Sequence, residues 1–184
     1  MKIKVEINDE LGSGLETRPS LLPNAGLGVF STVDRGINEA LCEYKGSVLD
    51  ELEKRERYDG VLPYVLKHPY FKKENNVLYQ QEHSLESCAC VDANPFIPGL
   101  PIGLGGFVND LNSRGCFEDS NDSLTYNTIY SPVCNKPLLL ICTCREIKAG
   151  EELYVDYGDA YWKTRNHAGL QNFYTNHCND LGKS

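Results

Sequence analysis

A charge-free stretch of 14 residues, Pro95 to Val108, lies near the middle of the chain and contains three prolines and four glycines. Proline removes a backbone donor and glycine weakens regular elements, so this stretch cannot form a continuous helix or strand. An irregular apolar segment of this length inside a compact domain is usually functional, and the alternative is a buried connector. The chain therefore has to fold as regular elements around an irregular centre.

Short apolar segments separated by turn signals dominate the rest of the chain. The run Leu138-Leu139-Leu140-Ile141, inside Pro137–Cys144, is typical of a fully buried strand. The polar segment Asp50–Tyr58 predicts a short helix, and a second one is expected over Tyr64–Lys67. Further strands are expected over residues 2–8, 27–33, 40–44, 124–130 and 151–155, with 76–81 and 85–91 as a strand pair and a helix over 161–174. These patterns predict a mostly-β single domain.

Length and charge limit the classes of partner. A chain of 184 residues commonly folds as one domain, so we expect residues 1–184 to form a single unit. Its 18 basic and 26 acidic residues give a net charge of −8, which disfavours direct nucleic-acid binding and favours a basic peptide as the charged partner. We find no secretory signal and no membrane-spanning apolar run, and we expect no membrane partner. The sequence does not indicate an oligomeric state.

The eight cysteines are expected to be reduced, because no secretory signal accompanies them. Two pairs, Cys88-x-Cys90 and Cys142-x-Cys144, have a period-2 spacing that puts both sulfurs on one face of a strand, and they lack the CxxC spacing of structural zinc. Core packing is favoured, and a metal-binding regulatory domain stays open as an alternative. The histidines have no ligand spacing and are expected at the surface; they are His68, His83, His167 and His177.

Five short segments carry the functional pattern of the sequence. Signatures of hydrolases, nucleotide-binding loops and zinc proteases are absent. Each of the five segments is weak evidence alone, but their order and spacing form a pattern. They are Asn24-Ala25-Gly26-Leu27-Gly28-Val29-Phe30, Glu43-Tyr44-Lys45-Gly46, Cys90-Val91-Asp92-Ala93, Gly106-Phe107-Val108-Asn109-Asp110 and Gly150-Glu151-Glu152-Leu153-Tyr154-Val155-Asp156-Tyr157-Gly158-Asp159.

In this order the segments resemble the SET domain of protein lysine methyltransferases, and the core of the resemblance covers residues 15–162. The resemblance implies a mostly-β, β-clip-like fold of small sheets with few short helices and a knot-like crossing of the chain near its C-terminus. It also implies that S-adenosyl-L-methionine occupies one cleft and becomes S-adenosyl-L-homocysteine. A peptide groove is expected on the opposite side, joined to the cofactor cleft by a narrow channel.

The resemblance assigns cofactor contacts to Gly26-Leu27-Gly28, where glycine lets backbone groups approach a ligand closely. Asn109 matches the family's asparagine, whose amide is expected to hold the amino-acid end of the cofactor. Asp110 follows it where the family often has histidine, and Gly106 replaces an arginine. We include Asp110 among the cofactor-binding residues. Trp162 is expected either to face the adenine or to anchor the last helix.

Tyr157 falls at the family's catalytic tyrosine, where it also contacts the cofactor, and Tyr44 falls at a tyrosine that lines the lysine channel. Methyl transfer needs a neutral amine, whereas free lysine has a pKa of about 10.4. A desolvated channel beside a sulfonium lowers that pKa, and a carboxylate there would raise it. Uncharged tyrosines therefore suit the site, because their oxygens can orient the amine and accept weak C–H···O contacts from the methyl group.

Three further residues are expected to line the lysine channel: Tyr126, Tyr154 and Val155. In the family, the position of Val155 helps to set how many methyl groups are added, and many relatives have an aromatic residue there. Asn127 matches a later asparagine of the motif that contains Asn109.

The C-terminal part is expected to close the site. Only Cys178 follows Tyr157, so we expect no cysteine-rich zinc lobe and no metal, with residues 161–178 serving as a helical lid. An acidic loop is the candidate attractor for a basic peptide, although such a loop is often merely solvated. The residues concerned are Glu118, Asp119 and Asp122.

These features together predict an S-adenosylmethionine-dependent protein-lysine N-methyltransferase that acts on a histone tail or another basic peptide. The alternative is a catalytically silent SET-like module that binds a peptide or partner protein, suggested by the changes at Gly106 and Asp110. A histone substrate implies a nuclear, chromatin-associated protein, acting in its own nucleus or in that of a host. The target lysine and the number of methyl groups are not indicated.

Overall fold

The computed structural model describes residues 11–58, 64–86, 88–94, 96–99, 103–111, 124–158 and 161–162. These residues form short strands, one α-helix and one 3₁₀-helix, which confirms the mostly-β prediction. The strands are β1 (Leu15–Pro19), β2 (Leu27–Ser31), β3 (Ala40–Glu43), β4 (Ser47–Leu49), β5 (Val65–His68), β6 (Phe71–Glu74), β7 (Val77–Gln80), β8 (Ala89–Asp92), β9 (Thr128–Pro132) and β10 (Leu139–Thr143). The helices are α1 (Glu51–Arg57) and η1 (Leu104–Phe107).

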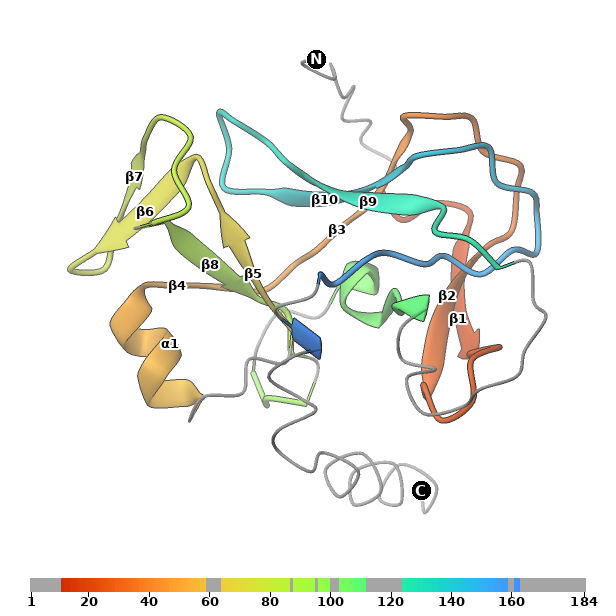
Figure 1. Cartoon of the computed structure of the whole chain (residues 1–184), viewed down its shortest axis with the longest axis horizontal. Helices are drawn as coiled ribbons and strands as arrows, with labels where there is room; N and C mark the ends of the chain where they lie inside the picture. Colours follow the sequence, from red (N-terminus) through yellow and green to blue (C-terminus); the bar gives the residue numbers. More distant parts are fainter. Residues whose placement is uncertain are drawn as a thin grey trace.

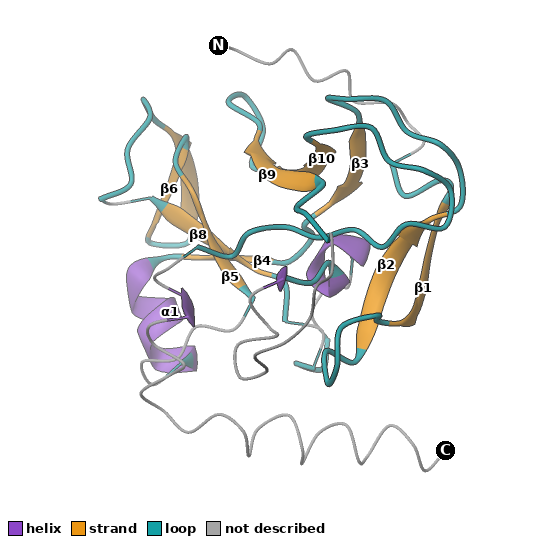
Figure 2. Ribbon diagram, turned by 45° about the vertical axis from the view of Figure 1, so that its right-hand side comes forward, coloured by secondary structure: helices purple, strands orange, loops and turns teal. Residues whose placement is uncertain are grey.

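The described strands form small antiparallel sheets, in the orders β1-β2, β3-β10-β9, β4-β8-β5 and β6-β7. The β1-β2 pair lies at one end of the molecule, and α1 with the β6-β7 hairpin lies at the other (Figure 1). The short helix η1, from the glycine-rich stretch, lies between these two ends (Figure 2). The irregular centre expected from the sequence is thus surrounded by regular elements.

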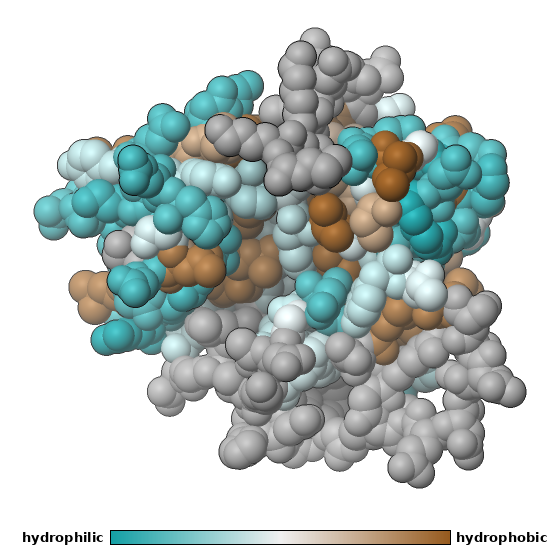
Figure 3. Space-filling model, turned by 45° about the horizontal axis from the view of Figure 1, so that its top comes forward, coloured by the Kyte–Doolittle hydropathy of each residue, from teal (hydrophilic) through white to brown (hydrophobic). Residues whose placement is uncertain are grey.

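The core forms where these sheets meet. All five residues of β10 are buried, which confirms the buried strand predicted from its apolar run. Exposed apolar side chains occur in several separate areas on the face shown in Figure 3, as is normal for a globular surface. The core cluster includes Val29, Leu41, Val91, Val108, Ile141, Leu153 and Val155.

Helix α1 begins and ends where the sequence predicts. A carboxylate oxygen of Asp50 accepts the backbone N–H of Glu53 at 2.9 Å, and Glu53 accepts the N–H of Asp50 at 2.8 Å, which forms a capping box. At the other end, Arg57 and Tyr58 donate to the buried carboxylate of Asp92 in β8, at 2.6 and 2.9 Å. These bonds hold the C-terminal end of α1 against the sheet β4-β8-β5.

The helix predicted over Tyr64–Lys67 is wrong, because residues 65–68 form strand β5. The segment pairs with β8 in an antiparallel register that sets Leu66 opposite Val91. A segment of four residues is too short for its hydrophobic pattern to distinguish a helix from a strand. Pairing with β8 decides the conformation here.

Two other expectations about strands were also wrong. The segments predicted as a pair over 76–81 and 85–91 do form β7 and β8, but β7 pairs with β6, and β8 lies between β4 and β5. Residues 151–155 form only isolated bridges instead of a strand. The strand predicted over residues 2–8 lies outside the described residues.

Residues 152–155 lie between earlier parts of the chain, in the region where the knot-like crossing is expected. Tyr154 forms a parallel bridge with Asn109, and Val155 forms one with Thr128. The buried Asn127 side chain fixes this arrangement: its Oδ1 accepts the N–H of Tyr154 at 2.7 Å, and its Nδ2 donates to the carbonyl of Glu152 at 2.8 Å. The segment that leads to Tyr157 is therefore held from two sides.

His68 is buried, contrary to the surface position expected for it, with 1% of its surface exposed. Its ring lies edge-on to Phe71, and Nε2 lies 3.0 Å from the carbonyl of Leu138. A carbonyl can only accept, so Nε2 carries the proton of the neutral ring. Of the other histidines, His83 is exposed as expected, and His167 and His177 lie outside the described residues.

Most of the described cysteines are buried as free thiols, in agreement with a packing role; they are Cys42, Cys88, Cys90 and Cys142. Burial raises the pKa of the Cys42 thiol to about 12. Within the described ranges, no three histidine, cysteine or acidic side chains lie together in a group that could hold a metal ion. The same residues contain no helix with both the length and the apolar character needed to cross a bilayer.

Candidate active site

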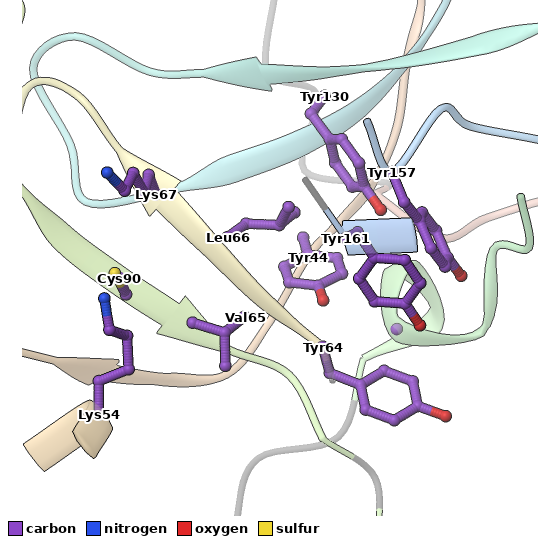
Figure 4. A pocket seen from close by; sticks show the side chains of 11 residues that line it. Tyr44, Lys54, Tyr64, Val65, Leu66, Lys67, Cys90, Tyr130, Tyr157 and Tyr161 are labelled. Atoms are coloured by element: carbon purple, nitrogen blue, oxygen red, sulfur yellow. The ribbon is translucent and has the colours of Figure 1, made fainter. Parts of the chain in front are cut away.

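A hollow of about 380 Å³ lies beside β5 and is lined at one end by tyrosines. Their rings gather on one side of Leu66, whereas Lys54, Lys67 and Cys90 lie on the other (Figure 4). A volume of this size is in the range of pockets that accept a small ligand or a side chain. The lining tyrosines are Tyr44, Tyr64, Tyr130, Tyr157 and Tyr161, and we call this end of the hollow the tyrosine pocket.

The register of the sheet β3-β10-β9 positions two of the tyrosines. Tyr44 directly follows β3, and its backbone N–H donates to the carbonyl of Leu139 at 2.8 Å. Tyr130 lies in β9 opposite Ile141 of β10. The two rings meet edge to face, with centroids 5.5 Å apart. The pocket wall is thus built from strands on both sides of β10.

The glycines of η1 allow the helix to pack directly on this wall. A Cβ at Gly105 would lie 2.7 Å from the carbonyl oxygen of Glu43, and one at Gly106 would lie 2.9 Å from that of Ala93. Any larger residue would push η1 away from the backbone beside Tyr44. This explains Gly106, where the family's pattern has arginine, because no side chain fits there without a backbone shift.

The tyrosine pocket is uncharged at neutral pH. Burial raises the pKa of Tyr44 well above its usual value of 10, and the nearby phenols of Tyr157 and Tyr161 raise it further. Burial, followed by the influence of Tyr44 and Tyr161, also raises the pKa of Tyr130. A lysine side chain that enters the pocket therefore leaves water without meeting a carboxylate, and this loss of solvation favours a neutral amine over an ammonium ion.

Tyr157 is oriented by hydrogen bonds at both its side chain and its backbone. Its hydroxyl donates to the carbonyl of Val108 at 2.7 Å, so the phenol oxygen can meet a ligand only as an acceptor. Its backbone N–H donates to Asp110 at 2.7 Å. The ring lies parallel to that of Trp162, with centroids 6.3 Å apart, and edge-on to Tyr161 at 4.8 Å.

Asp110 connects this aromatic group to the rest of the site. Its side chain is buried, and one carboxylate oxygen accepts both the N–H of Tyr157 and the indole Nε1–H of Trp162, the latter at 2.9 Å. The other oxygen accepts the hydroxyl of Tyr126 at 2.6 Å. These contacts give Asp110 a positioning role, and the direct contact with the cofactor expected from the sequence stays a prediction.

Asn109, which directly precedes Asp110, contacts the first glycine motif. Its amide Nδ2 donates to the carbonyl of Leu27 at 3.0 Å and to Glu152 Oε1 at 3.3 Å. A Cβ at Gly28 would overlap Glu152 Oε1, whereas nothing lies within 4 Å of a Cβ built on Gly26. Two segments that the sequence assigns to the cofactor thus meet, with open space beside Gly26.

Glu152 is the residue that sequence reasoning missed here. It is 2% exposed, and its carboxylate accepts the hydroxyl of Ser20 at 2.6 Å and the backbone N–H of Leu21 at 2.7 Å. The hydroxyl of Tyr154 donates to it at 2.8 Å. Its place in the Gly-Glu-Glu-Leu segment did not indicate this role, because Ser20 and Leu21 lie more than 130 positions earlier in the chain.

The family model of the SET domain matches residues 26–158 of the chain. The chain belongs to the SET-domain family. Among curated proteins, it is 25% identical over 159 residues to the N-lysine methyltransferase KMT5A of Xenopus tropicalis, an alignment that covers 85% of this chain. This SET-domain chain spans 40% of the length of that relative.

The other predicted channel residues of this SET domain lie outside the lining of the tyrosine pocket. Tyr126 bonds to Asp110, and the buried Tyr154 bonds to Glu152. Val155 is buried in the core beside Thr128. Tyr64 and Tyr130 line the pocket instead, and the sequence did not single them out, because their positions depend on how β5 and β9 pair.

Tyr64, which lines the pocket, has an unusual backbone conformation, with φ at 60°. A left-handed conformation is uncommon for a bulky residue, and strained residues of this kind cluster at functional sites. Its ring meets Phe96 at 6.1 Å. The candidate attractors Glu118, Asp119 and Asp122, and the proposed lid beyond Trp162, lie outside the described residues.

Proposed function

We propose that this chain is a single SET domain, residues 1–184, that transfers a methyl group from S-adenosylmethionine to a lysine of a protein or peptide. The observation that carries the proposal is the placement of Tyr157, whose oriented phenol faces a neutral tyrosine pocket while its backbone N–H is fixed by Asp110. Asp110 directly follows Asn109, so the pocket and the candidate cofactor residues share one short segment.

The residues fit the cofactor at the first glycine motif. Gly26 has a φ of 74° and leaves space that a side chain would fill, so backbone groups can approach a ligand there. The Asn109 amide beside the Leu27 carbonyl is placed to bind polar groups of the cofactor. S-adenosylmethionine, when bound, supplies the methyl group.

The pocket residues would prepare the acceptor amine. A free lysine has a pKa of about 10.4, so at pH 7 the neutral form costs about 4.6 kcal/mol. Tyr44 and Tyr130 remain neutral, and no lining residue of the pocket is a carboxylate, so an amine that loses its solvation there gains no counter-charge and the ammonium ion is disfavoured. The Tyr157 oxygen can accept a hydrogen bond from the amine and so direct its lone pair.

A silent binding module is the alternative suggested by Gly106 and Asp110. Both residues have packing roles that are compatible with turnover: Gly106 lets η1 approach Ala93, and Asp110 orients Tyr157. The net charge of −8 supports a histone tail or another basic peptide as the substrate. A histone substrate would in turn place the protein in the nucleus.

Calorimetric titration with S-adenosylmethionine and S-adenosylhomocysteine tests the proposal without a known substrate. We expect saturable one-to-one binding of both, followed by transfer of labelled methyl groups to lysine peptides. Binding without transfer to any histone or peptide in a screen would favour the silent module, and no binding up to millimolar ligand would contradict the cofactor assignment.

A further inference from the structure

The hollow that contains the tyrosine pocket continues past β5 to a second, basic end. Successive residues of a strand point to opposite faces, so Leu66 faces the tyrosines, whereas Val65 and Lys67 face the other side, where Lys54 of α1 also lines the hollow. Lys67 lies opposite Cys90 in the register of β5 and β8. Lys54, Val65, Lys67 and Cys90 all line this end of the hollow, and we call it the basic recess (Figure 4).

One edge of β5 is available to an extended peptide. The backbone N–H of Ala93 donates to the carbonyl of Tyr64, and bonding residues alternate along an antiparallel pair. The backbone groups of Val65 and Lys67 therefore point away from β8, and no described residue forms a backbone hydrogen bond with them. A strand added at this edge would place alternate side chains on the two faces of β5.

The charge of the basic recess is opposite to that of the whole chain. The Lys54 side chain is 10% exposed, and its ammonium is paired with Glu51. The Lys67 ammonium donates to the carbonyl of Leu85 at 2.9 Å, and among the described residues no carboxylate forms an ion pair with it. None of the residues that line the hollow is acidic. Glu51, which pairs with Lys54 and also lies within electrostatic reach of Lys67, offsets only part of this charge, so the recess stays basic in a protein with a net charge of −8.

We infer that the basic recess binds the residue next to the target lysine, that it selects an acidic side chain there, and that Lys67 determines this preference. The inference rests on the proposed function for the identity of the target lysine. When that lysine enters the tyrosine pocket on the Leu66 face, its neighbour in an extended peptide faces Val65 and Lys67. An overall basic substrate would thus carry an acidic residue beside its target.

Peptide binding tests this preference without requiring turnover. Fluorescein-labelled peptides Gly-Ala-X-Lys-X-Ala-Gly, with X as Glu, Gln or Lys, are titrated with the full chain and S-adenosylhomocysteine, and anisotropy is measured. We expect affinities in the order Glu, Gln, Lys, with steps of up to about fivefold that shrink at 0.5 M salt. In Lys67→Glu the order reverses, and in Lys67→Gln it flattens.

Lys136→Glu is the matched control, because it changes the net charge by the same −2 at an exposed residue of the β9–β10 turn. The control is expected to keep the wild-type order. The inference is overturned if no peptide binds, if the wild type shows no order, if Lys67→Glu keeps the wild-type order, or if Lys136→Glu also reverses it.

Methyl transfer to the same peptides separates this inference from the proposed function. The expected binding order without transfer would contradict the methyltransferase assignment and leave the basic recess supported. Transfer without any charge preference would overturn the inference alone.

Discussion

The indole Nε1–H of Trp162 donates to the carboxylate of Asp110 at 2.9 Å, and the oxygen that accepts it also accepts the backbone N–H of Tyr157. One buried atom therefore fixes both the candidate catalytic tyrosine and the aromatic ring stacked on it. The positions of these two rings cannot change independently of Asp110.

Replacing Asp110 tests this positioning. Asp110→Ala leaves three donors without their acceptor, and we expect a loss of about 3 kcal/mol in the free energy of unfolding and at least a tenfold fall in kcat. Trp162 is the single tryptophan of the chain, so its emission reports the change directly and is expected to shift to longer wavelength. Asp110→Asn keeps one acceptor oxygen and should restore the emission and most of the rate. Wild-type emission in Asp110→Ala would contradict the role.

Tyr157→Phe is expected to separate catalysis from folding. The substitution removes the bond to Val108 and leaves the ring in place, so the free energy of unfolding should fall by only about 1 kcal/mol. Methyl transfer should fall at least 100-fold, while calorimetry shows S-adenosylhomocysteine bound within about threefold of the wild-type affinity. Near-wild-type turnover would rule out the catalytic assignment.

Gly28→Ala tests the contact between the first glycine motif and Glu152. A Cβ there would overlap Glu152 Oε1 and lie 2.7 Å from its Cδ, so the carboxylate must leave its bonds with Ser20 and Asn109. We expect weaker cofactor binding by titration and a loss of about 2 kcal/mol in stability. Gly99→Ala is the matched control outside the cofactor motif: its φ of 83° costs about 1 kcal/mol, but nothing lies within 4 Å of its Cβ. Equal cofactor affinity in the two variants would argue against the role of Glu152.

His68 is expected to make the protein less stable in mild acid. Burial lowers its pKa from 6.5, so below pH 6.5 the unfolded state takes up a proton that the folded state refuses. Stability should then fall by up to about 1.4 kcal/mol per pH unit, until the pH passes the folded pKa. Urea unfolding at pH 7.5, 6.5 and 5.5 measures this slope. We expect His68→Gln to reduce the slope and the exposed His83→Gln to keep it; the same slope in all three proteins would refute the assignment.

The sequence predicted correctly those helices and strands that are specified by residues within their own segments. The capping residues of α1 and the apolar run of β10 both lie within the segments that they specify. By contrast, β5 depends on β8, and no property of four residues reveals that partner. The family's motifs led to Asn109 and Leu27, which do meet. They did not lead to Glu152 or Tyr130, because the importance of a buried acceptor or a strand tyrosine appears only when the distant chain is in place.

The bridges of Tyr154 with Asn109 and of Val155 with Thr128 have a consequence for the order of assembly. A chain is synthesised from its N-terminus, so the segment that carries Tyr157 reaches partners that have already left the ribosome. Its contacts are long-range and form late in folding. The sheets can therefore be complete while the tyrosine pocket is still open, and a nascent chain gains its chemistry only after the segment that carries Tyr157 has joined them.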